Sequence, residues 1–387
     1  MGRDCAVAVI GGGIVGTSVL YHLAERGETD VVLLEQDQLG SGSTSGAVGG
    51  VRHVFSHPAN VDAGEWNLRF YREFDERVGQ PLPVDESGYV YLFASAAERD
   101  RWERQKELYD EAGLDTRVIA PAETGDLFDL LDTSAVVGAF HAPDCLHLDP
   151  YTATRGFATA ARERGGTVHT GTTVEDVTVE DGAVDTVVTD GENYEPDHVV
   201  NAAGGWAPAV GEMVGLELPI DRFVRRILVT EELAAGATPL FIDRERQCYF
   251  RAEPNGGMVL CDTGNDVEDV TSPARAGGSP GQDYYASALS KVETHVPDVV
   301  DAAVINDWAG VQTSTPDGHP LLGETDVEGF SLACGFNGLG LMVAPTVGRA
   351  LADALLGEPS DVLGVGRLGL DRFDRPPSDR IEPEELA

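Results

Sequence analysis

The sequence predicts an α/β protein that is organised around a βαβ unit at the start of the chain. Three observations support this fold class. Residues 6–10 form a short apolar run suited to a buried parallel strand, and a glycine-rich turn follows at once. Apolar residues then recur at helical spacing as far as Arg26-Gly27. A second apolar run, residues 31–34, ends in Glu35, and this order of strand, turn, helix, strand and acid is typical of dinucleotide binding.

The glycines of the turn have the spacing G-x-G-x-x-G, and each has a physical task. Gly11 permits the sharp turn, Gly13 lets a pyrophosphate approach the backbone, and Gly16 lets the helix pack close to the strand. Ile14 and Val15 open the helix, whose free N–H groups and positive dipole end face the phosphates. A purely structural turn is the alternative, but the surrounding pattern favours a dinucleotide.

The acid that ends the second strand, Glu35, can accept hydrogen bonds from ribose hydroxyls. Its charge would repel a 2′-phosphate on the same ribose. The unit does not separate NAD from FAD, so the identity of the dinucleotide depends on later segments of the chain.

The composition limits the class of protein. The chain has 387 residues, enough for two domains, and 42% of them are hydrophobic. No apolar run approaches the ~20 residues that a membrane span needs. Because the chain enters its first strand almost directly, we expect no signal peptide and a cytoplasmic protein. The net charge of −39 disfavours a nucleic-acid partner, since phosphate binding requires a basic face.

The charged residues predict a halophilic protein, adapted to a high-salt cytoplasm. The sequence has 66 acidic residues against 27 basic ones, and only Lys106 and Lys291 are lysines. Salt screens the self-repulsion of such a surface. We therefore expect the melting temperature to fall when salt is removed, as measured by thermal unfolding at several salt concentrations. A melting temperature that is indifferent to salt would instead indicate an acidic protein from a mesophile.

The five cysteines, Cys5, Cys145, Cys248, Cys261 and Cys334, are scattered along the chain. They form no C-x-x-C pair and have no nearby histidines at ligand spacing. We expect reduced and mostly buried thiols, no disulfide framework and no metal site.

A loop of small residues follows the acid. It contains Gly42-Ser43-Thr44 and then Gly49-Gly50-Val51-Arg52-His53. A flexible linker is one reading of such a composition. However, the loop directly follows the ribose-binding acid, where small residues can press backbone and hydroxyl groups onto a cofactor. We favour the cofactor reading.

With these motifs the chain resembles the flavoproteins related to glycine oxidase, monomeric sarcosine oxidase and D-amino-acid oxidase. The resemblance implies FAD rather than NAD. It also implies a discontinuous Rossmann-like FAD-binding domain (GR2-type) with an inserted antiparallel-sheet α+β substrate domain. On this plan the FAD-binding domain comprises residues 1–88, 141–214 and 308–370, the substrate domain comprises residues 89–140 and 215–307, and residues 371–387 form an acidic C-terminal tail.

Two later segments fit the same plan. The first is an apolar strand that runs into the turn at residues 203–206. The second, residues 335–342, reads G-F-N-G-L-G-L-M and joins a strand to a helix whose start can supply N–H donors to the flavin pyrimidine. The motifs and the resemblance together assign to FAD the residues Gly11, Gly13, Ile14, Val15, Gly16, Glu35, Gln36, Gly42, Ser43, Thr44, Gly49, Gly50, Val174, Ala203, Gly204, Trp206, Gly310, Gly335, Asn337, Gly338, Leu339, Gly340, Leu341 and Met342.

The reaction that the resemblance implies is oxidation of a C–N bond in a small amine or amino acid, by hydride transfer to flavin N5. A carboxylate substrate needs a fixed cation, and Arg52 matches the arginine that pairs with the substrate carboxylate in sarcosine-oxidase-like enzymes. A salt bridge to a surface acid is the alternative role of Arg52. Tyr249 and Arg251 are further catalytic candidates, because residues two apart on a strand share a face of the sheet.

The chain also departs from the family pattern. Met342 stands where sarcosine oxidase has a lysine, so the carboxylate clamp must differ. Gly310 and Gly46 stand where relatives have the cysteine or histidine that is linked to the flavin, so FAD should be bound non-covalently. The oxidases place a lysine over flavin N5, but residues 258–261 contain none. We therefore expect a dehydrogenase that passes electrons to an acceptor other than oxygen.

Two other functions stay open at this point. An NAD-binding dehydrogenase of Rossmann type would be purified without flavin absorbance. A flavin-binding subunit or assembly factor of a larger complex would have little activity alone. The sequence does not select among sarcosine, glycine, proline, dimethylglycine and D-amino acids as substrate, and the electron acceptor and oligomeric state are unknown.

Overall fold

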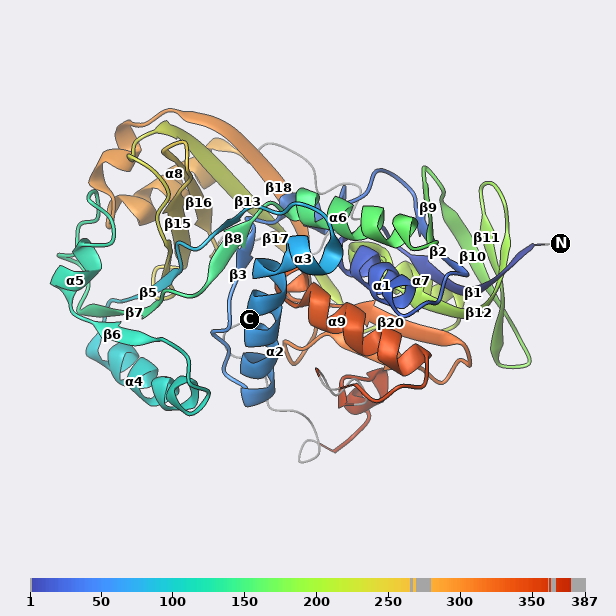
Figure 1. Cartoon of the computed structure of the whole chain (residues 1–387). Coiled ribbons are helices and arrows are strands. Elements are labelled where there is room, and N and C mark those ends of the chain that lie inside the picture. Colours follow the sequence, from blue (N-terminus) through green and yellow to red (C-terminus); the bar gives the residue numbers. More distant parts are fainter. Residues whose placement is uncertain (1, 265–266, 269–279, 361, 363–366, 377–387) are drawn as a thin grey trace.

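The computed structural model describes residues 2–264, 267–268, 280–360, 362 and 367–376. These residues form two lobes, each built on one large sheet (Figure 1). We call the sheet that contains the N-terminal strand the nucleotide sheet and the other the substrate sheet.

The nucleotide sheet has a parallel centre. β1 (Arg3–Ile10) lies between β2 (Val31–Glu35) and β12 (Tyr194–Asn201), and both neighbours run parallel to it. The apolar residues of β1 and β2 are buried because helices cover the sheet, as is usual for parallel strands. The other strands of this sheet are β9 (Thr167–Thr170), β10 (Val174–Glu180), β11 (Ala183–Thr189), β19 (Leu321–Glu324) and β20 (Phe330–Cys334).

Three helices pack together on one side of this sheet (Figure 1): α1 (Ile14–Glu25), α6 (Pro150–Glu163) and α9 (Gly340–Leu355). Small residues allow α1 and α9 to approach closely, since a Cβ on Gly348 would lie 2.4 Å from Ser18 Oγ. Ser18 Oγ donates to the carbonyl of Ala344 at 2.7 Å, and Arg26 Nε donates to the buried carboxylate of Asp353 at the same distance. The first and last α-helices in the described part of the chain are therefore fixed to each other.

The substrate sheet has nine strands in the described part of the chain, in the order β17-β13-β16-β15-β14-β5-β7-β6, with β18 also paired to β13. Its pairs are antiparallel except for β5 with β14. The strands are β5 (Tyr89–Phe93), β6 (Arg117–Ile119), β7 (Gly138–Ala142), β13 (Asp221–Glu232), β14 (Leu240–Asp243), β15 (Cys248–Ala252), β16 (Gly257–Asp262), β17 (Val267–Glu268) and β18 (Val304–Ser314).

The two faces of the substrate sheet have different roles, because successive side chains of a strand point to opposite faces. Val90, Phe241 and Phe250 pack in one cluster with residues of α8 (Gln282–Glu293). Their chain neighbours Tyr91 and Tyr249 point the other way and line a cavity. One face therefore forms the core of the lobe, and the other face forms a wall of the site.

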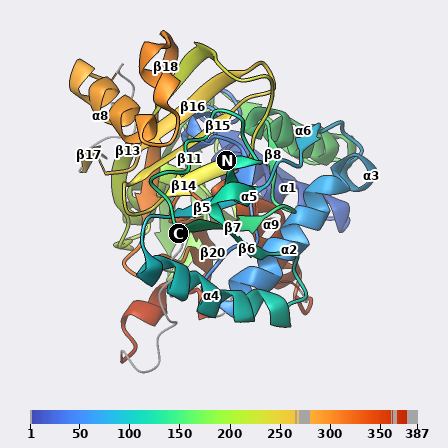
Figure 2. The same cartoon turned by 90° about the vertical axis from the view of Figure 1, so that its left-hand side faces the viewer.

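Smaller elements connect the lobes. A three-stranded sheet is formed by β3 (Gly50–Val51), β4 (Val84–Asp85) and β8 (Leu146–Leu148). Figure 2, seen from the left of Figure 1, shows the substrate lobe in front, with α4 below its sheet. The remaining helices are η1 (Ser43–Gly46), α2 (Pro58–Arg72), α3 (Phe74–Val78), α4 (Ala96–Glu111), α5 (Pro121–Gly125), η2 (Gly204–Trp206), α7 (Ala207–Met213), η4 (Pro297–Asp301) and η6 (Leu370–Phe373).

The strands of the substrate sheet can be compared with the expected domain plan, which stays a prediction. Residues 89–140 and 215–307 both contribute strands to the substrate sheet. β18 crosses the expected boundary at residue 308, because it pairs with β13 along its whole length. The expected tail, residues 371–387, starts with a packed turn in which the buried Arg372 pairs with Asp317 at 2.8 Å, and residues 377–387 lie outside the described part.

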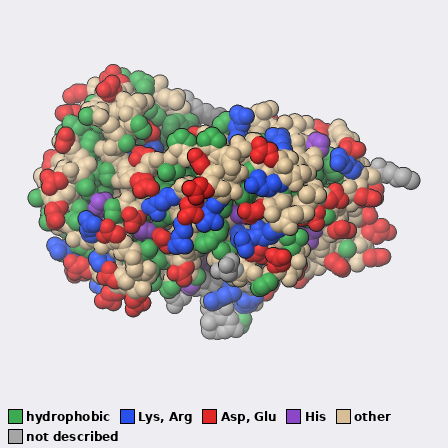
Figure 3. All heavy atoms as spheres, viewed as in Figure 1, with side chains coloured by type: hydrophobic (Ala, Val, Ile, Leu, Met, Phe, Trp, Pro, Cys, Tyr) green, Lys and Arg blue, Asp and Glu red, His purple; other side chains and the backbone are tan. Residues whose placement is uncertain are grey.

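The remaining features concern the surface and the cysteines. Acidic side chains are spread over both lobes of the face in Figure 3. Of the helices that the structure describes, none has the length and apolarity to cross a bilayer. All five cysteines are buried free thiols. The described residues contain no group of three or more His, Cys, Asp or Glu that could hold a metal ion.

Candidate active site

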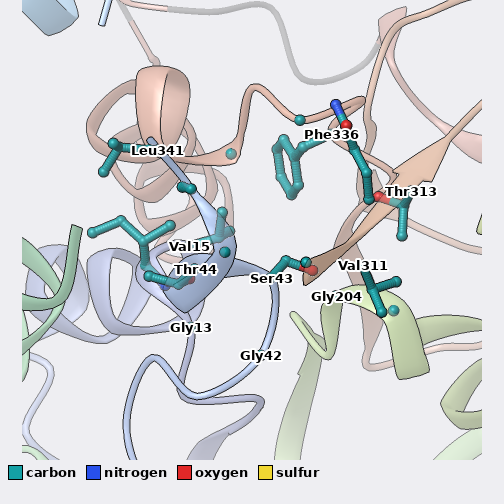
Figure 4. A pocket seen from close by; sticks show the side chains of 18 of the residues that line it. Gly13, Val15, Gly42, Ser43, Thr44, Gly204, Val311, Thr313, Phe336 and Leu341 are labelled. Carbon is teal, nitrogen blue, oxygen red and sulfur yellow. The ribbon is translucent and has the colours of Figure 1, made fainter. Parts of the chain in front are cut away.

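A cavity of about 640 Å³ lies between the nucleotide sheet and the substrate sheet. Its volume is in the range of ordinary ligand sites. In Figure 4 the turn before α1 and the loop with Ser43 and Thr44 meet the start of α9, with Phe336 and Leu341, across it. The segments that surround the cavity are thus far apart in the sequence.

The three glycines of the first turn differ in what the protein itself requires. Gly11 has φ +112°, and a Cβ there would lie 2.5 Å from the carbonyl oxygen of Ala202. A Cβ on Gly16 would lie 2.0 Å from the carbonyl oxygen of Gly11. By contrast, Gly13 has an ordinary φ of −73°, and a Cβ there would meet only Thr44 Oγ1, at 3.3 Å. Gly11 and Gly16 are therefore required by packing, whereas Gly13 leaves an open cradle at the start of α1.

Thr44 attaches the small-residue loop to this cradle. Its Oγ1 accepts a hydrogen bond from the backbone N–H of Ile14 at 3.1 Å. Thr44 is buried, and Gly42 and Ser43 beside it line the cavity. The loop is thus part of the site and is not a linker.

Glu35 is held by backbone groups at the edge of the cavity. One carboxylate oxygen accepts from the N–H of Gly12 at 2.6 Å, and the other accepts from the N–H of Asp37 at 2.8 Å. These bonds fix the orientation of the carboxylate. Each oxygen retains a further lone pair with which it can accept from a ribose hydroxyl.

Two glycines from distant segments, Gly46 and Gly310, contact each other at the wall of the cavity. A Cβ on Gly46 would lie 2.6 Å from the Cα of Gly310, and a Cβ on Gly310 would lie 3.0 Å from the Cα of Gly46. The indole N–H of Trp308 donates to the carbonyl of Gly46 at 3.2 Å and fixes this contact. Neither position has room for a larger side chain without a backbone shift.

The start of α9 forms the end of the cavity. Gly338 has φ +78°, and a Cβ there would lie 1.7 Å from Gln312 Nε2. Asn337 is buried and bonds to the backbone N–H of Thr315 at 3.1 Å, so its side chain shapes the turn. Because the first N–H groups of a helix have no partner within it, the start of α9 can donate to a ligand.

The substrate sheet contributes aromatic side chains, and the segment after β3 contributes a cation. Tyr89, Tyr91 and Tyr249 line the cavity together with Arg52. Arg52 is 5% exposed, donates to Tyr91 Oη at 3.1 Å and also bonds to the carbonyl of Val54. Burial raises the pKa values of Tyr91 and Tyr249, so both phenols stay neutral at physiological pH.

The expected site residues fall into three groups. All the residues assigned to FAD line the cavity except Gly16 and Gly335, which lie behind it. Of the expected catalytic residues, Arg52 and Tyr249 line the cavity. Arg251 does not: its guanidinium is buried, and it pairs with Glu253 at 2.6 Å and lies 3.9 Å from Asp85. The alternation argument placed Arg251 on the face of Tyr249, but its charge is directed to these two acids.

Sequence reasoning missed part of the wall. The residues of the substrate sheet that line the cavity beyond those expected include Tyr89, Tyr91, Arg225, Leu240, Ile242 and Arg244. A signal was present in the alternation of β5, where residues 89 and 91 share one face. Nothing local marks Arg225 or Arg244, because their place depends on which strands pair.

The fold and the cavity define a dinucleotide-binding protein, with a glycine-built nucleotide half and a second half walled by the other sheet. A model of the family described as DAO, FAD dependent oxidoreductase, matches residues 6–354. The chain belongs to this family.

Individual relatives agree with this assignment. The chain is 30% identical over 370 residues to human mitochondrial dimethylglycine dehydrogenase, covering 91% of this chain and 42% of that protein. It is 26% identical over 375 residues to the sarcosine oxidase subunit beta of Rhizobium meliloti (strain 1021), covering 95% of this chain and 88% of the subunit. It is also similar to the crystal structure of L-proline dehydrogenase from P. horikoshii, with a TM-score of 0.89, 27% identity, and coverage of 97% and 99%.

FAD, the cofactor of the family, fits the residues present. The open cradle at Gly13, the helix start at Ile14 and the fixed carboxylate of Glu35 suit a pyrophosphate and a ribose. The glycine-lined start of α9 suits the flavin end. The residues of this chain therefore form both ends of a dinucleotide site.

We expect FAD to be released by acid precipitation. Gly46 and Gly310, the two positions that the family resemblance associates with a flavin-linked residue, are glycines in mutual contact. No nucleophile is therefore available there to form a bond to the flavin. The absorbance of the supernatant and of the washed pellet measures the release, and yellow colour retained in the pellet would contradict non-covalent binding.

Proposed function

We propose that this chain oxidises a C–N bond in a small amine or amino acid of the sarcosine, glycine or proline type. The observation that carries the proposal is the position of Arg52, a buried arginine that lines the same cavity as the dinucleotide turn. A guanidinium is the side chain best suited to hold a carboxylate. The names of the relatives, dimethylglycine dehydrogenase and L-proline dehydrogenase, support a substrate of this kind.

The wall of the cavity suits an amine in its neutral form. Three guanidiniums, those of Arg52, Arg225 and Arg244, line the cavity. Positive charges nearby disfavour the protonated form of a bound amine, so its pKa falls and its lone pair becomes available. The phenols of Tyr91 and Tyr249 are neutral, and they orient the substrate by hydrogen bonds and do not act as bases.

FAD, when bound, would supply a two-electron acceptor for the oxidation. The residues of this chain position the carbon and nitrogen atoms of the substrate for this chemistry. The apolar side chains of Leu240 and Ile242 line the same wall and exclude water from it.

An anaerobic bleaching screen tests the proposed function. The holoenzyme is mixed with sarcosine, dimethylglycine, glycine, proline and D-amino acids without oxygen, and the flavin absorbance is followed. We expect at least one amine with a carboxylate to bleach the flavin. A chain whose flavin is bleached by dithionite but by none of these compounds is not an amine oxidoreductase of this kind.

We further expect a dehydrogenase, with slow reoxidation by air. Residues 258–261, where the resemblance to the oxidases would place a lysine over flavin N5, contain no lysine. Met258 in this stretch is fully buried in the core of the lobe. Lys106 pairs with Asp110 on α4, and Lys291 pairs with the buried Asp262, so neither lysine lines the cavity. Stopped-flow mixing of the reduced protein with oxygen measures the rate, and reoxidation as fast as catalytic turnover would contradict this expectation.

A second candidate function is that of a flavin-binding subunit in a larger complex. The chain covers 88% of a protein named as subunit beta of sarcosine oxidase, and this match favours the candidate. It spans only about 42% of the length of dimethylglycine dehydrogenase. A flavin that no amine bleaches in the isolated chain, and that is bleached only after a partner protein is added, would select this second function.

A further inference from the structure

The cavity wall carries a charge opposite to that of the molecule as a whole. The chain has a net charge of −39, yet three arginines and a single carboxylate, Glu35, are among the described residues that line the cavity. Glu35 belongs to the dinucleotide end and accepts from two backbone N–H groups. The substrate half is therefore cationic within an acidic protein, and low-dielectric walls strengthen such a field.

Two of the arginines lie beside the same tyrosine. Arg52 donates to Tyr91 Oη at 3.1 Å. Tyr91 pairs in register with Ile242 of β14, and Arg244 follows two residues later, on the side of the strand that faces the cavity. The guanidiniums of Arg52 and Arg244 are close enough for each to disfavour the other's charge.

The turn that carries Arg244 is firmly anchored. Asp243, directly before it, is fully buried and bonds to His295 Nε2 at 2.8 Å and to the guanidinium of Arg246 at 2.9 Å. Gln247, which ends the turn with φ +56°, accepts at its carbonyl from the N–H of Thr263 at 2.8 Å. Arg244 is thus presented to the cavity from a fixed backbone, as expected of a binding residue.

Charged groups of both signs act on Arg244. Burial lowers the pKa of Arg244, and the guanidiniums of Arg101 and Arg52 lower it further, against the opposing effects of Tyr91 and Glu98. Burial raises the pKa of Glu98 to about 7, so this carboxyl is only partly ionised near neutral pH. A bound carboxylate at Arg244 would offset the repulsion among the guanidiniums.

We propose that the substrate carries two anionic groups on one amine, with Arg52 holding the first carboxylate and Arg244 holding the second. The chemical class is a dicarboxylic secondary or tertiary amine, such as an N-carboxyalkyl amino acid. The proposal rests on the proposed function for the role of Arg52. Arg225 also lines the cavity and adds to the same positive field. It lies on β13, where it pairs in register with Gly310.

The first test compares ligands that differ by one carboxylate. The holoenzyme is titrated at one fixed ionic strength with glutarate and butyrate, which cannot be oxidised at a C–N bond, and binding is read from the perturbed flavin absorbance. Iminodiacetate and sarcosine are then compared as reductants in the anaerobic assay. We expect the dicarboxylate of each pair to bind at least about tenfold more tightly, because a second charge-assisted bond forms.

The second test removes one guanidinium. Arg244→Gln should abolish the preference for glutarate over butyrate, and it should raise the KM for iminodiacetate at least about tenfold more than it raises the KM for sarcosine. Arg244→Lys should keep part of the preference, since it keeps the charge and loses the planar fork. Arg117→Gln is the matched control, because Arg117 is exposed and pairs with Asp115 at the surface.

Each outcome separates the two proposals. Equal affinity of the unmodified protein for glutarate and butyrate overturns the inference. An equal loss of affinity for both ligands in Arg244→Gln also overturns it, because Arg244 would then belong to a clamp for a single carboxylate. If glutarate is preferred through Arg244 but no amine bleaches the flavin, the dianion site stands and the proposed oxidation fails. If sarcosine bleaches the flavin as readily as iminodiacetate in every variant, the oxidation stands and the dianion site fails.

Discussion

Gly13→Ala is expected to yield a folded protein that has lost most of its affinity for FAD. The backbone at Gly13 has an ordinary φ of −73°, and an added Cβ meets only Thr44 Oγ1, at 3.3 Å. Alanine there requires Thr44 Oγ1 to move by only a few tenths of an ångström, so we expect the protein itself to fold. The pyrophosphate does not tolerate alanine, because it must approach the backbone at this point. We expect the Kd for FAD to rise roughly 100-fold, which corresponds to about 2.7 kcal/mol.

The measurement combines fluorescence titration of the FAD-free protein with its thermal unfolding. Gly281→Ala is a matched control, since Gly281 also has an ordinary φ, lies outside the cavity and has open space around its Cβ position. Gly16→Ala should behave differently and destabilise the protein itself, because its Cβ would lie 2.0 Å from a backbone oxygen. An unchanged Kd in Gly13→Ala would mean that the dinucleotide does not bind against this turn.

Arg52→Gln is expected to raise the KM for a carboxylate substrate roughly 100-fold, which corresponds to about 3 kcal/mol for the loss of a buried charge-assisted bond. Arg52 lines the cavity with 5% of its surface exposed, so little solvent would screen its attraction for a carboxylate. We expect a smaller change in kcat, because the carboxylate is distant from the bond that is oxidised and is held equally before and during the reaction.

Arg52 also supports the wall, and this second role requires a control. It donates to Tyr91 and to the carbonyl of Val54, and its guanidinium lies 4.8 Å from the ring centre of Phe55. Arg52→Lys keeps the charge and part of this packing, and it should recover some of the lost affinity. The FAD content and melting temperature of each variant are measured first. A KM that stays unchanged in a flavin-loaded Arg52→Gln protein would remove Arg52 from the substrate site.

Local motifs made the dinucleotide half predictable. The turn at Gly11 and Gly16 is determined within a few residues, because the strand, the sharp turn and the helix follow one another directly in the chain. Glu35 ends the next strand, and parallel strands of one sheet bring their carboxyl ends to the same edge. The resemblance to known flavoproteins extended this prediction to the start of α9, which lies on the same cavity.

The substrate half was less predictable because its residues come from paired strands. Arg251 has the right residue type and spacing, yet its guanidinium pairs with Glu253, a contact that alternation alone does not reveal. The contact of Gly46 with Gly310 joins segments 264 residues apart, and Trp308 reaches the same point from β18. The expected plan places residues 308–314 in the FAD-binding domain, whereas β18, which contains them, pairs with β13 of the substrate sheet.

The sequence by itself determined the βαβ unit, the dinucleotide class and the family, because each depends on the spacing of residues that are near one another in the chain. The tertiary structure alone decided which arginines line the cavity. Arg244 follows β14, and it lines the same cavity as Arg52 because β14 pairs with β5. Strand pairing is set by the burial of whole sheet faces and not by any local pattern.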